Sequence, residues 1–362
     1  MGSQPEETAE VLTRVDGGLG RIVLNRPRAL NSLTHGMITA VRATLDAWAA
    51  DDRVRAVALT GAGERGLCAG ADIRAMHEDA KAGGAGMRAF FRDEYRLNSL
   101  IAHYPKPYLA VMDGITMGGG VGLSAHGAVR IVTERSTVAM PETRIGLVPD
   151  VGGSRLLALA PGELGTHLGL SSTSMGPGDA LLCGFADHFT PSARVPDLLD
   201  ALARDLAGAT DAAAALAAVE SAVAAHAEPA PPPGLAANRP WIDACYAADT
   251  AEEIVQRLID SGAAEAKEAA GQLLGNSPTA VKVALAALRR ARTLPSLEAV
   301  LDQEYRISCA ALAGHDLVEG IRAQVIDKDR DPHWSPGSLA EVTEADVERF
   351  FAPCPEGELG LA

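Results

Sequence analysis

Three consecutive glycines, Gly118–Gly120, follow an apolar segment of the chain and lead into a second short apolar segment. Because glycine has no Cβ, such a run lets the backbone pass where a larger residue would collide. The pattern predicts a buried strand over 107–112, a tight turn at the glycines and a short helix after them. The first amides of that helix would point outward, where the helix dipole favours negative charge. The chain therefore needs a fold in which buried strands lead directly into helices.

The first half of the chain repeats this alternation, which predicts an α/β core. The helix over 32–50 would begin at a Ser32 or Thr34 cap and bury an apolar face at helical spacing. The other predicted elements are two strands around a glycine turn within 11–25, strands over 54–60, 128–133 and 137–139, and a helix over 86–104.

The second half is predicted to be mainly helical from about residue 156 onward. It is interrupted by a proline-rich linker, HAEPAPPPG, at 226–234, which cannot be helical. We therefore expect three parts: a core over 1–200, a variable helical segment over 201–275 that contains the linker, and a C-terminal helical region over 276–362.

The charge and the cysteine content restrict the partners of the protein. A formal net charge of −15 argues against a nucleic-acid partner, which would require clustered Lys and Arg. Five cysteines, an odd number without zinc-ligand spacing, indicate reduced thiols and a cytoplasmic location. The polar start of the chain does not resemble a secretory leader, and no apolar stretch is long enough to predict a membrane span.

A second loop of small residues, CAGADI at 68–73, also follows a predicted buried strand. Its Ala71 amide and the amides after the glycine run would together suit an oxyanion such as forms when a thioester carbonyl is attacked. The alternative is that both loops are simply tight turns, since glycine marks many of them.

These loops belong to a longer set of segments that resembles the enoyl-CoA hydratase/isomerase (crotonase) superfamily. Within it, the resemblance is to the 3-hydroxyisobutyryl-CoA hydrolase branch, and it covers nearly the whole chain except about 195–270. The segments that carry it are LNRPRALNSL (24–33), CAGADI (68–73), FFRDEYRLN (90–98), KPYLAVMDGITMGGG (106–120), VGLSAHG (121–127), MPETRIGLVPDVGG (140–153), SPTAVKVAL (277–285), EYRIS (304–308) and GHDLVEGIRAQVIDKDRDPHW (314–334).

The resemblance implies the crotonase (ClpP-like) fold, a spiral of ββα units with a helical C-terminal region. It also implies that the amides of Ala71 and Gly119 hold the thioester oxygen. Hydratases of the superfamily use two glutamates around a water. The position of one of them is Gly122 here, whereas the other is present as Glu142. Since glycine has no proton to give or take, the hydratase pair is broken.

The hydrolase branch keeps the glutamate and adds an aspartate in the following turn, which is Asp150 here. The resemblance makes Glu142 either the nucleophile or the general base for water, and the two roles remain open. Asp150 would bind the 3-hydroxyl of the substrate and influence the protonation of Glu142, unless it only shapes the Pro-Asp turn. Glu94 would lie at the acyl pocket, unless it is a surface charge of its helix.

The resemblance also assigns residues to coenzyme A, whose phosphates need cations or amides. These residues are Arg26, Arg28, Ala69, Asp72, Ile73 and Lys328, although each charged one can equally be solvated. The proposed chemistry needs no metal, nicotinamide or flavin, and the glycine motifs lack dinucleotide spacing. His77 and His126 are interpreted as structural, and no G-x-S-x-G elbow supports a serine triad.

Three functions therefore remain in view. The first is an acyl-CoA thioester hydrolase acting on a 3-hydroxyacyl group in valine catabolism. The second is an enoyl-CoA hydratase or isomerase, and the third is a non-catalytic CoA-binding module. Members of the superfamily often form trimers or hexamers, so a homo-oligomer is a further expectation that no pattern in the chain tests.

Overall fold

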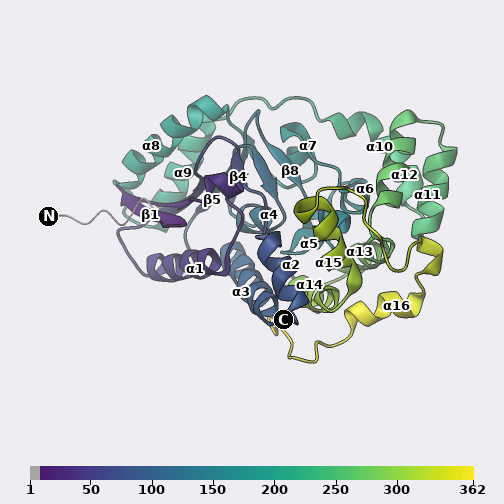
Figure 1. Cartoon of the computed structure of the whole chain (residues 1–362). Coiled ribbons are helices and arrows are strands. Elements are labelled where there is room, and N and C mark those ends of the chain that lie inside the picture. The colour runs from purple at the N-terminus through teal and green to yellow at the C-terminus, as the bar shows by residue number, and fades with distance from the viewer. Residues whose placement is uncertain (1–8) are drawn as a thin grey trace.

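The computed structural model describes residues 9–362 and has the predicted α/β architecture (Figure 1). The larger sheet has six strands in the order β1-β2-β3-β5-β7-β9, in which only the β1–β2 pair is antiparallel. Its strands are β1 (Val11–Asp16), β2 (Leu19–Leu24), β3 (Ala56–Gly61), β5 (Tyr108–Met112), β7 (Val129–Val132) and β9 (His188–Phe189).

A smaller sheet of three parallel strands carries the connections that matter for function. Its strands are β4 (Gly66–Cys68), β6 (Ile115–Met117) and β8 (Thr137–Ala139), and β6 lies between the other two. Each strand of this sheet comes shortly after a strand of the larger one, namely β3, β5 and β7. The repeated pairing of one strand from each sheet confirms the predicted spiral of ββα units.

Helices form most of the second half of the chain. Their bounds are α1 His35–Ala49, α2 Ile73–Lys81, α3 Ala85–Ala102, α4 Gly119–Ser124, α5 Gly153–Leu159, α6 Leu164–Ser171, α7 Pro177–Leu182, α8 Val195–Leu206, α9 Ala212–His226, α10 Gly234–Tyr246, α11 Ala251–Asp260, α12 Ala264–Gly275, α13 Pro278–Ala291, α14 Leu297–Leu312, α15 His315–Ile321 and α16 Glu344–Glu348. Short 3₁₀ segments include η2 (Pro27–Ala29) and η3 (Glu142–Ile145), and a π-helical turn, η5, covers Arg322–Ile326.

The predicted helix over 32–50 is α1, and the structure decides its cap. Thr34 is the N-cap, because its side chain accepts a hydrogen bond from the amide of Met37, so the Ser32 alternative is wrong. The predicted apolar face is buried, as shown by Met37, Val41, Leu45 and Trp48. The predicted non-helical linker is confirmed over 227–233, between α9 and α10, whereas its two end residues, His226 and Gly234, belong to these helices because the prolines lie between them.

Two hydrophobic clusters lie on opposite faces of the larger sheet because side chains alternate along a strand. In β3, Val57 and Leu59 belong to the larger cluster, whereas Ala56 and Ala58 belong to the smaller one. Helices α8 and α9 cover the face with the small alanines (Figure 1). The division into three parts stays a prediction, and the larger cluster takes residues from all of them.

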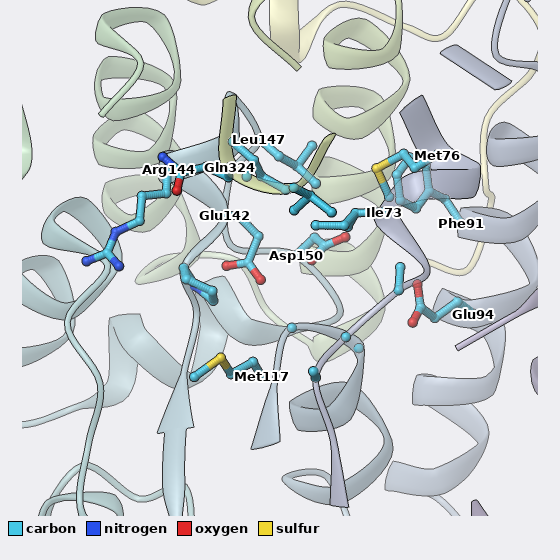
Figure 2. A pocket seen from close by; sticks show the side chains of 18 residues that line it. Ile73, Met76, Phe91, Glu94, Met117, Glu142, Arg144, Leu147, Asp150 and Gln324 are labelled. Atoms are coloured by element: carbon cyan, nitrogen blue, oxygen red, sulfur yellow. The ribbon is translucent and has the colours of Figure 1, made fainter. Parts of the chain in front are cut away.

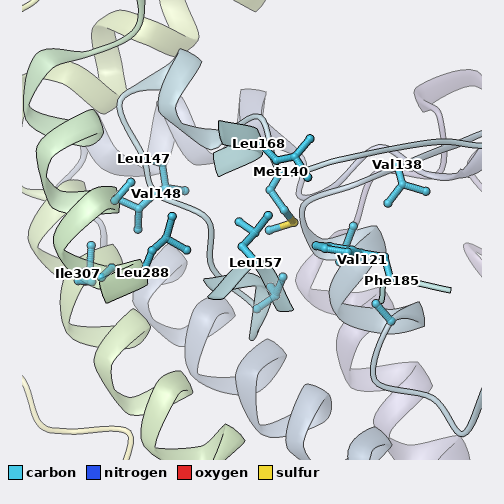
Figure 3. Close-up of a cluster of buried hydrophobic side chains, with 14 of the residues drawn as sticks. Val121, Val138, Met140, Leu147, Val148, Leu157, Leu168, Phe185, Leu288 and Ile307 are labelled. Atoms are coloured by element: carbon cyan, nitrogen blue, oxygen red, sulfur yellow. The ribbon is translucent and has the colours of Figure 1, made fainter. Parts of the chain in front are cut away.

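The larger cluster extends from the strands to the C-terminal helices (Figure 3). Leu147 and Val148 come from the loop after β8, and they lie beside Leu288 of α13 and Ile307 of α14. The loop that carries the predicted carboxylates is therefore anchored in the core rather than free at the surface. Within residues 9–362, no helix combines the length and apolar character that a membrane span requires.

Close packing of α5 against α6 gives a stability prediction. A Cβ placed on Gly165 of α6 would lie 1.7 Å from the carbonyl oxygen of Leu157 in α5, a contact that only backbone movement relieves. We expect Gly165→Ala to lower the free energy of unfolding, measured by urea titration, by about 1–3 kcal/mol or more. Gly271→Ala is the matched control, because nothing lies within 4 Å of its Cβ position in α12. The control should be neutral or stabilising by up to about 1 kcal/mol.

Candidate active site

The candidate active site is a cavity at the carboxyl ends of the three strands of the smaller sheet. Because β4, β6 and β8 are parallel neighbours, the segments that follow them leave the same edge of the sheet. Residues 69–71 and 73, residues 118–119 and six residues of the segment 141–150 line a cavity of about 180 Å³, together with residues from α3 and η5 (Figure 2). The sheet thus brings together three loops that are far apart in the chain.

The two predicted amide donors, at Ala71 and Gly119, both belong to this lining. The amide of Leu33 donates to Gly70 O at 2.8 Å, and the amide of Asp72 donates to Leu33 O at 2.9 Å. In a parallel bridge of this kind the residue between these partners turns its own amide to the other side, which here is Ala71. Gly119 is the first residue of α4, where the amides have no partner within the helix.

Three buried carboxylic acids face the cavity: Glu94, Glu142 and Asp150 (Figure 2). A Cβ on Gly118 would lie 2.9 Å from Glu142 Oε1, and one on Gly119 would lie 2.4 Å from Glu94 Oε1. The glycine run therefore leaves the room that these two acids occupy. Glu94 Oε1 and Glu142 Oε2 have no hydrogen-bond partner within the described part of the chain.

Burial raises the pKa of all three acids, although by different amounts. It raises the pKa of Asp150 to about 6, while a hydrogen bond from the Tyr95 hydroxyl opposes the rise. The pKa values of Glu94 and Glu142 are raised well above their usual range, first by burial and then by the charge of Asp150. An ionised Asp150 therefore favours neutral glutamates beside it, because like charges in one buried site repel.

Comparison with known proteins identifies the family of this site. The sequence model described as enoyl-CoA hydratase/isomerase matches residues 19–351. The 3-hydroxyisobutyryl-CoA hydrolase of Gallus gallus is 40% identical over 357 residues, which are 98% of this chain and 92% of that protein. The human protein of the same name is 38% identical over 360 residues, with 99% and 92% covered.

The chain belongs to the enoyl-CoA hydratase/isomerase family.

Solved structures of the family have the same fold over almost the entire chain. A carnitinyl-CoA dehydratase from Mycobacterium thermoresistibile is 51% identical and has a TM-score of 0.92. The match covers 98% of this chain and 99% of the dehydratase chain. An enoyl-CoA hydratase from Rhodobacter sphaeroides is 41% identical, with a TM-score of 0.88 and coverage of 97% and 99%. Hydrolase and hydratase names thus both occur among similar proteins, and the residues of the site must distinguish them.

The position of the absent hydratase glutamate, Gly122, is enclosed by its neighbours. A Cβ there would lie 2.7 Å from the Cβ of Val151 and 2.8 Å from Nδ2 of Asn98. Any side chain at position 122 would therefore collide with the loop after Asp150. Sequence reasoning did not find Asn98, which is fully buried and has no partner for either polar atom among the described residues.

The turn after Asp150 is held from two sides. Glu304 of α14 accepts hydrogen bonds from the amides of Gly152, at 2.7 Å, and Ser154, at 3.0 Å, and burial raises its pKa to about 8. His126 contacts Val151 O through Nε2 at 2.7 Å, and burial lowers the pKa of His126 to about 4. The neutral ring donates to this carbonyl, which agrees with its interpretation as structural.

His77 is also buried, with Nδ1 lying 3.1 Å from a carboxylate oxygen of Glu78. Its side chain is absent from the cavity lining, which likewise agrees with a structural role. Three residues that do reach the lining were missed by sequence reasoning: Arg144, and Gln324 and Val325 of η5. The π-helical turn that directs the last two depends on packing, since Arg74 of α2 donates to Val325 O at 2.8 Å.

The residues predicted to bind coenzyme A divide into two groups. Ala69 and Ile73 line the cavity, whereas Asp72 caps α2 through the amide of Ala75. Arg26 forms ion pairs with Glu10 and Asp72, each at 3.0 Å, and therefore stabilises the loop at 68–73. Two other predicted cations, Arg28 and Lys328, are exposed and also lie outside the cavity lining. A role of these residues in CoA binding stays a prediction.

The enclosure of Gly122 can be tested by unfolding. We expect Gly122→Ala to lower the free energy of unfolding by about 1–3 kcal/mol, because the new methyl group overlaps Val151 and Asn98. The same substitution in an Asn98→Ala background should have a smaller effect, because one of the two collisions is gone. An equal effect in both backgrounds would show that Asn98 does not fill this space.

Proposed function

We propose that this protein hydrolyses the thioester of 3-hydroxyisobutyryl-CoA, releasing 3-hydroxyisobutyrate and free coenzyme A, as a step of valine catabolism. The observation that carries the proposal is the combination of Glu142 and Asp150 at the cavity with an enclosed Gly122. Hydration of a double bond in this family uses a second glutamate at that position, and no side chain fits there. The hydrolase names of the relatives support the same reaction.

In the proposed reaction, the thioester oxygen accepts hydrogen bonds from the amides of Ala71 and Gly119. Fixed donors of this kind stabilise the negative charge that develops on the oxygen as the carbonyl is attacked. They need little reorganisation, because the Ala71 amide is fixed by the bridge to Leu33 and the Gly119 amide by the start of α4.

Glu142 supplies the attack in one of two ways. As a nucleophile it bonds to the acyl carbon, the C–S bond breaks, and the thiolate leaves and takes a proton; water then hydrolyses the mixed anhydride. As a general base it takes a proton from the water that attacks the thioester, after which the C–S bond breaks and the thiolate leaves with a proton. Hydroxylamine added during turnover distinguishes the two, since only a mixed anhydride yields a hydroxamate on Glu142.

Asp150 is proposed to bind the 3-hydroxyl of the acyl group, and Glu94 to close the acyl pocket beside Gly119. Arg26, Arg28, Asp72 and Lys328 are proposed to approach coenzyme A from outside the cavity. The reaction needs no cofactor beyond the CoA of its substrate. A cytoplasmic location and a homo-oligomer remain predictions, and the animal hydrolases are named mitochondrial.

Dehydration or hydration of an acyl-CoA is the second candidate, favoured by the names of the two solved relatives. It would have to rely on Glu142 with Asp150 in place of the usual pair. The two candidates differ in one product, because only hydrolysis liberates a thiol.

The direct test measures both reactions on the purified protein. We expect thiol release from 3-hydroxyisobutyryl-CoA, followed with a thiol reagent, and no loss of the enoyl absorbance of crotonyl-CoA. Turnover of crotonyl-CoA without thiol release would instead support the second candidate. If neither assay detects turnover but the protein still binds CoA, the protein would be a non-catalytic module.

Replacing the proposed attacking group gives the second test of this site. We expect Glu142→Gln to reduce kcat by at least about 1000-fold, because an amide neither attacks the carbonyl nor accepts a proton. Affinity for coenzyme A, measured by calorimetry, should be retained. Glu265→Gln, an exposed residue of α12, is the control. Survival of most activity in Glu142→Gln would remove Glu142 from its role.

The repulsion between the carboxylates predicts a shift in pH dependence. Glu142 acts only when ionised, and its pKa is raised first by burial and then by the charges of Asp150, Glu304 and Glu94. Asp150→Asn removes one of these charges and therefore lowers the pKa of Glu142, so activity should persist to lower pH. The measurement is kcat against pH on isobutyryl-CoA, which lacks the 3-hydroxyl. Asp205→Asn on the surface of α8 should leave the profile unchanged, and an equal profile in Asp150→Asn would contradict the coupling.

A further inference from the structure

A tyrosine from α3 contacts Asp150 inside the protein. The Tyr95 hydroxyl donates to Asp150 Oδ2 at 2.7 Å and also lies 2.8 Å from Ser308 Oγ of α14. Tyr95 and Ser308 are both fully buried. Three segments separated by 55 and 213 positions in the chain therefore meet at one hydroxyl group.

The donors and acceptors fix the direction of both hydrogen bonds. A tyrosine hydroxyl has one proton, and an ionised carboxylate only accepts, so Tyr95 gives its proton to Asp150. The contact between Tyr95 and Ser308 must then be donated by Ser308. The result is a chain of two hydrogen bonds that ends on Asp150 Oδ2, in a part of the molecule closed to solvent.

This chain engages one oxygen of Asp150, Oδ2. Asp150 lines the cavity, and no hydrogen bond from another residue within 9–362 reaches its Oδ1, although the carboxylate also interacts with its own backbone amide. Unlike Oε2 of Glu142, Oδ1 of Asp150 is not one of the enclosed side-chain atoms that lack a hydrogen-bond partner. Because Oδ2 accepts the hydrogen bond from Tyr95, rotation of the carboxylate would break a charge-assisted hydrogen bond.

We propose that Tyr95, supported by Ser308, is a positioning residue that aims Asp150 Oδ1 at the 3-hydroxyl of the acyl group. The pair Tyr95–Ser308 thereby determines the preference for 3-hydroxyacyl over unsubstituted acyl thioesters. This inference rests on the proposed hydrolase function. Tyr95 itself does not reach the cavity lining and acts through Asp150.

The competing explanation is that Tyr95 only fills the core. Its ring packs against Phe91, with ring centroids 5.8 Å apart, and against Tyr305, at 6.3 Å. Phenylalanine would preserve both contacts and remove only the hydroxyl. Tyr305 provides a matched control, because it is equally buried in the same aromatic group and its hydroxyl has no partner among the described residues.

The experiment compares kcat/KM for 3-hydroxyisobutyryl-CoA and isobutyryl-CoA in the unaltered protein and four variants. We expect Tyr95→Phe to reduce the ratio of the two values by roughly 10- to 100-fold, the range for a hydrogen bond to a charged group. Most of the reduction should come from the hydroxylated substrate. Ser308→Ala should reduce the ratio less, Ser308→Thr should retain it, and Tyr305→Phe should match the unaltered protein. Circular dichroism and thermal unfolding verify that each variant is folded.

Each outcome has a distinct meaning. An unaltered protein that releases no thiol from either substrate would overturn the proposed function itself. If the unaltered protein prefers the hydroxylated substrate and Tyr95→Phe keeps that preference, the function stands and the inference is wrong. An equal loss on both substrates in Tyr95→Phe would also overturn the inference, because it would identify Tyr95 as a packing residue only.

Discussion

The parallel pairing of β4, β6 and β8 is the constraint on which the site depends. Neighbouring parallel strands place their carboxyl ends at one edge, so the loops at 69–73, 118–119 and 141–150 line a single cavity. The larger sheet holds these strands in place through β3, β5 and β7, which precede them in the chain. Anchoring of the last loop in the core through Leu147 and Val148 removes the freedom that a surface loop would have.

Glycines lie directly against the buried carboxylic acids of this cavity. Gly118 and Gly119 lie against the carboxylates of Glu142 and Glu94, and Gly122 lies against Asn98 and Val151. The absence of Cβ atoms lets α3 and the loop after β8 approach α4 closely enough to bury three acids together. Burial in turn raises the pKa of all three acids, and the charge of Asp150 raises the pKa values of Glu94 and Glu142 further.

The same geometry separates two chemistries within one family. Similar proteins include both hydrolases and hydratases by name, and the fold is common to them. A fold does not decide between water addition to a double bond and cleavage of a thioester. The proposed function places the difference in one enclosed glycine and one aspartate, so the proposal depends on the site residues more directly than on overall identity.

The sequence by itself determined the strands, the helices and the two loops of small residues, and its family resemblance predicted Glu142 and Asp150 as candidate site residues. These features depend on local spacing and on motifs that remain recognisable in one dimension. Only the tertiary structure placed Arg26 in ion pairs, put Asn98 beside Gly122, and joined Tyr95 to Asp150 and Ser308. The physical reason is that such contacts form where α3 and α14 pack against the loop after β8, and residue spacing along the chain does not encode which side chains of packed helices meet.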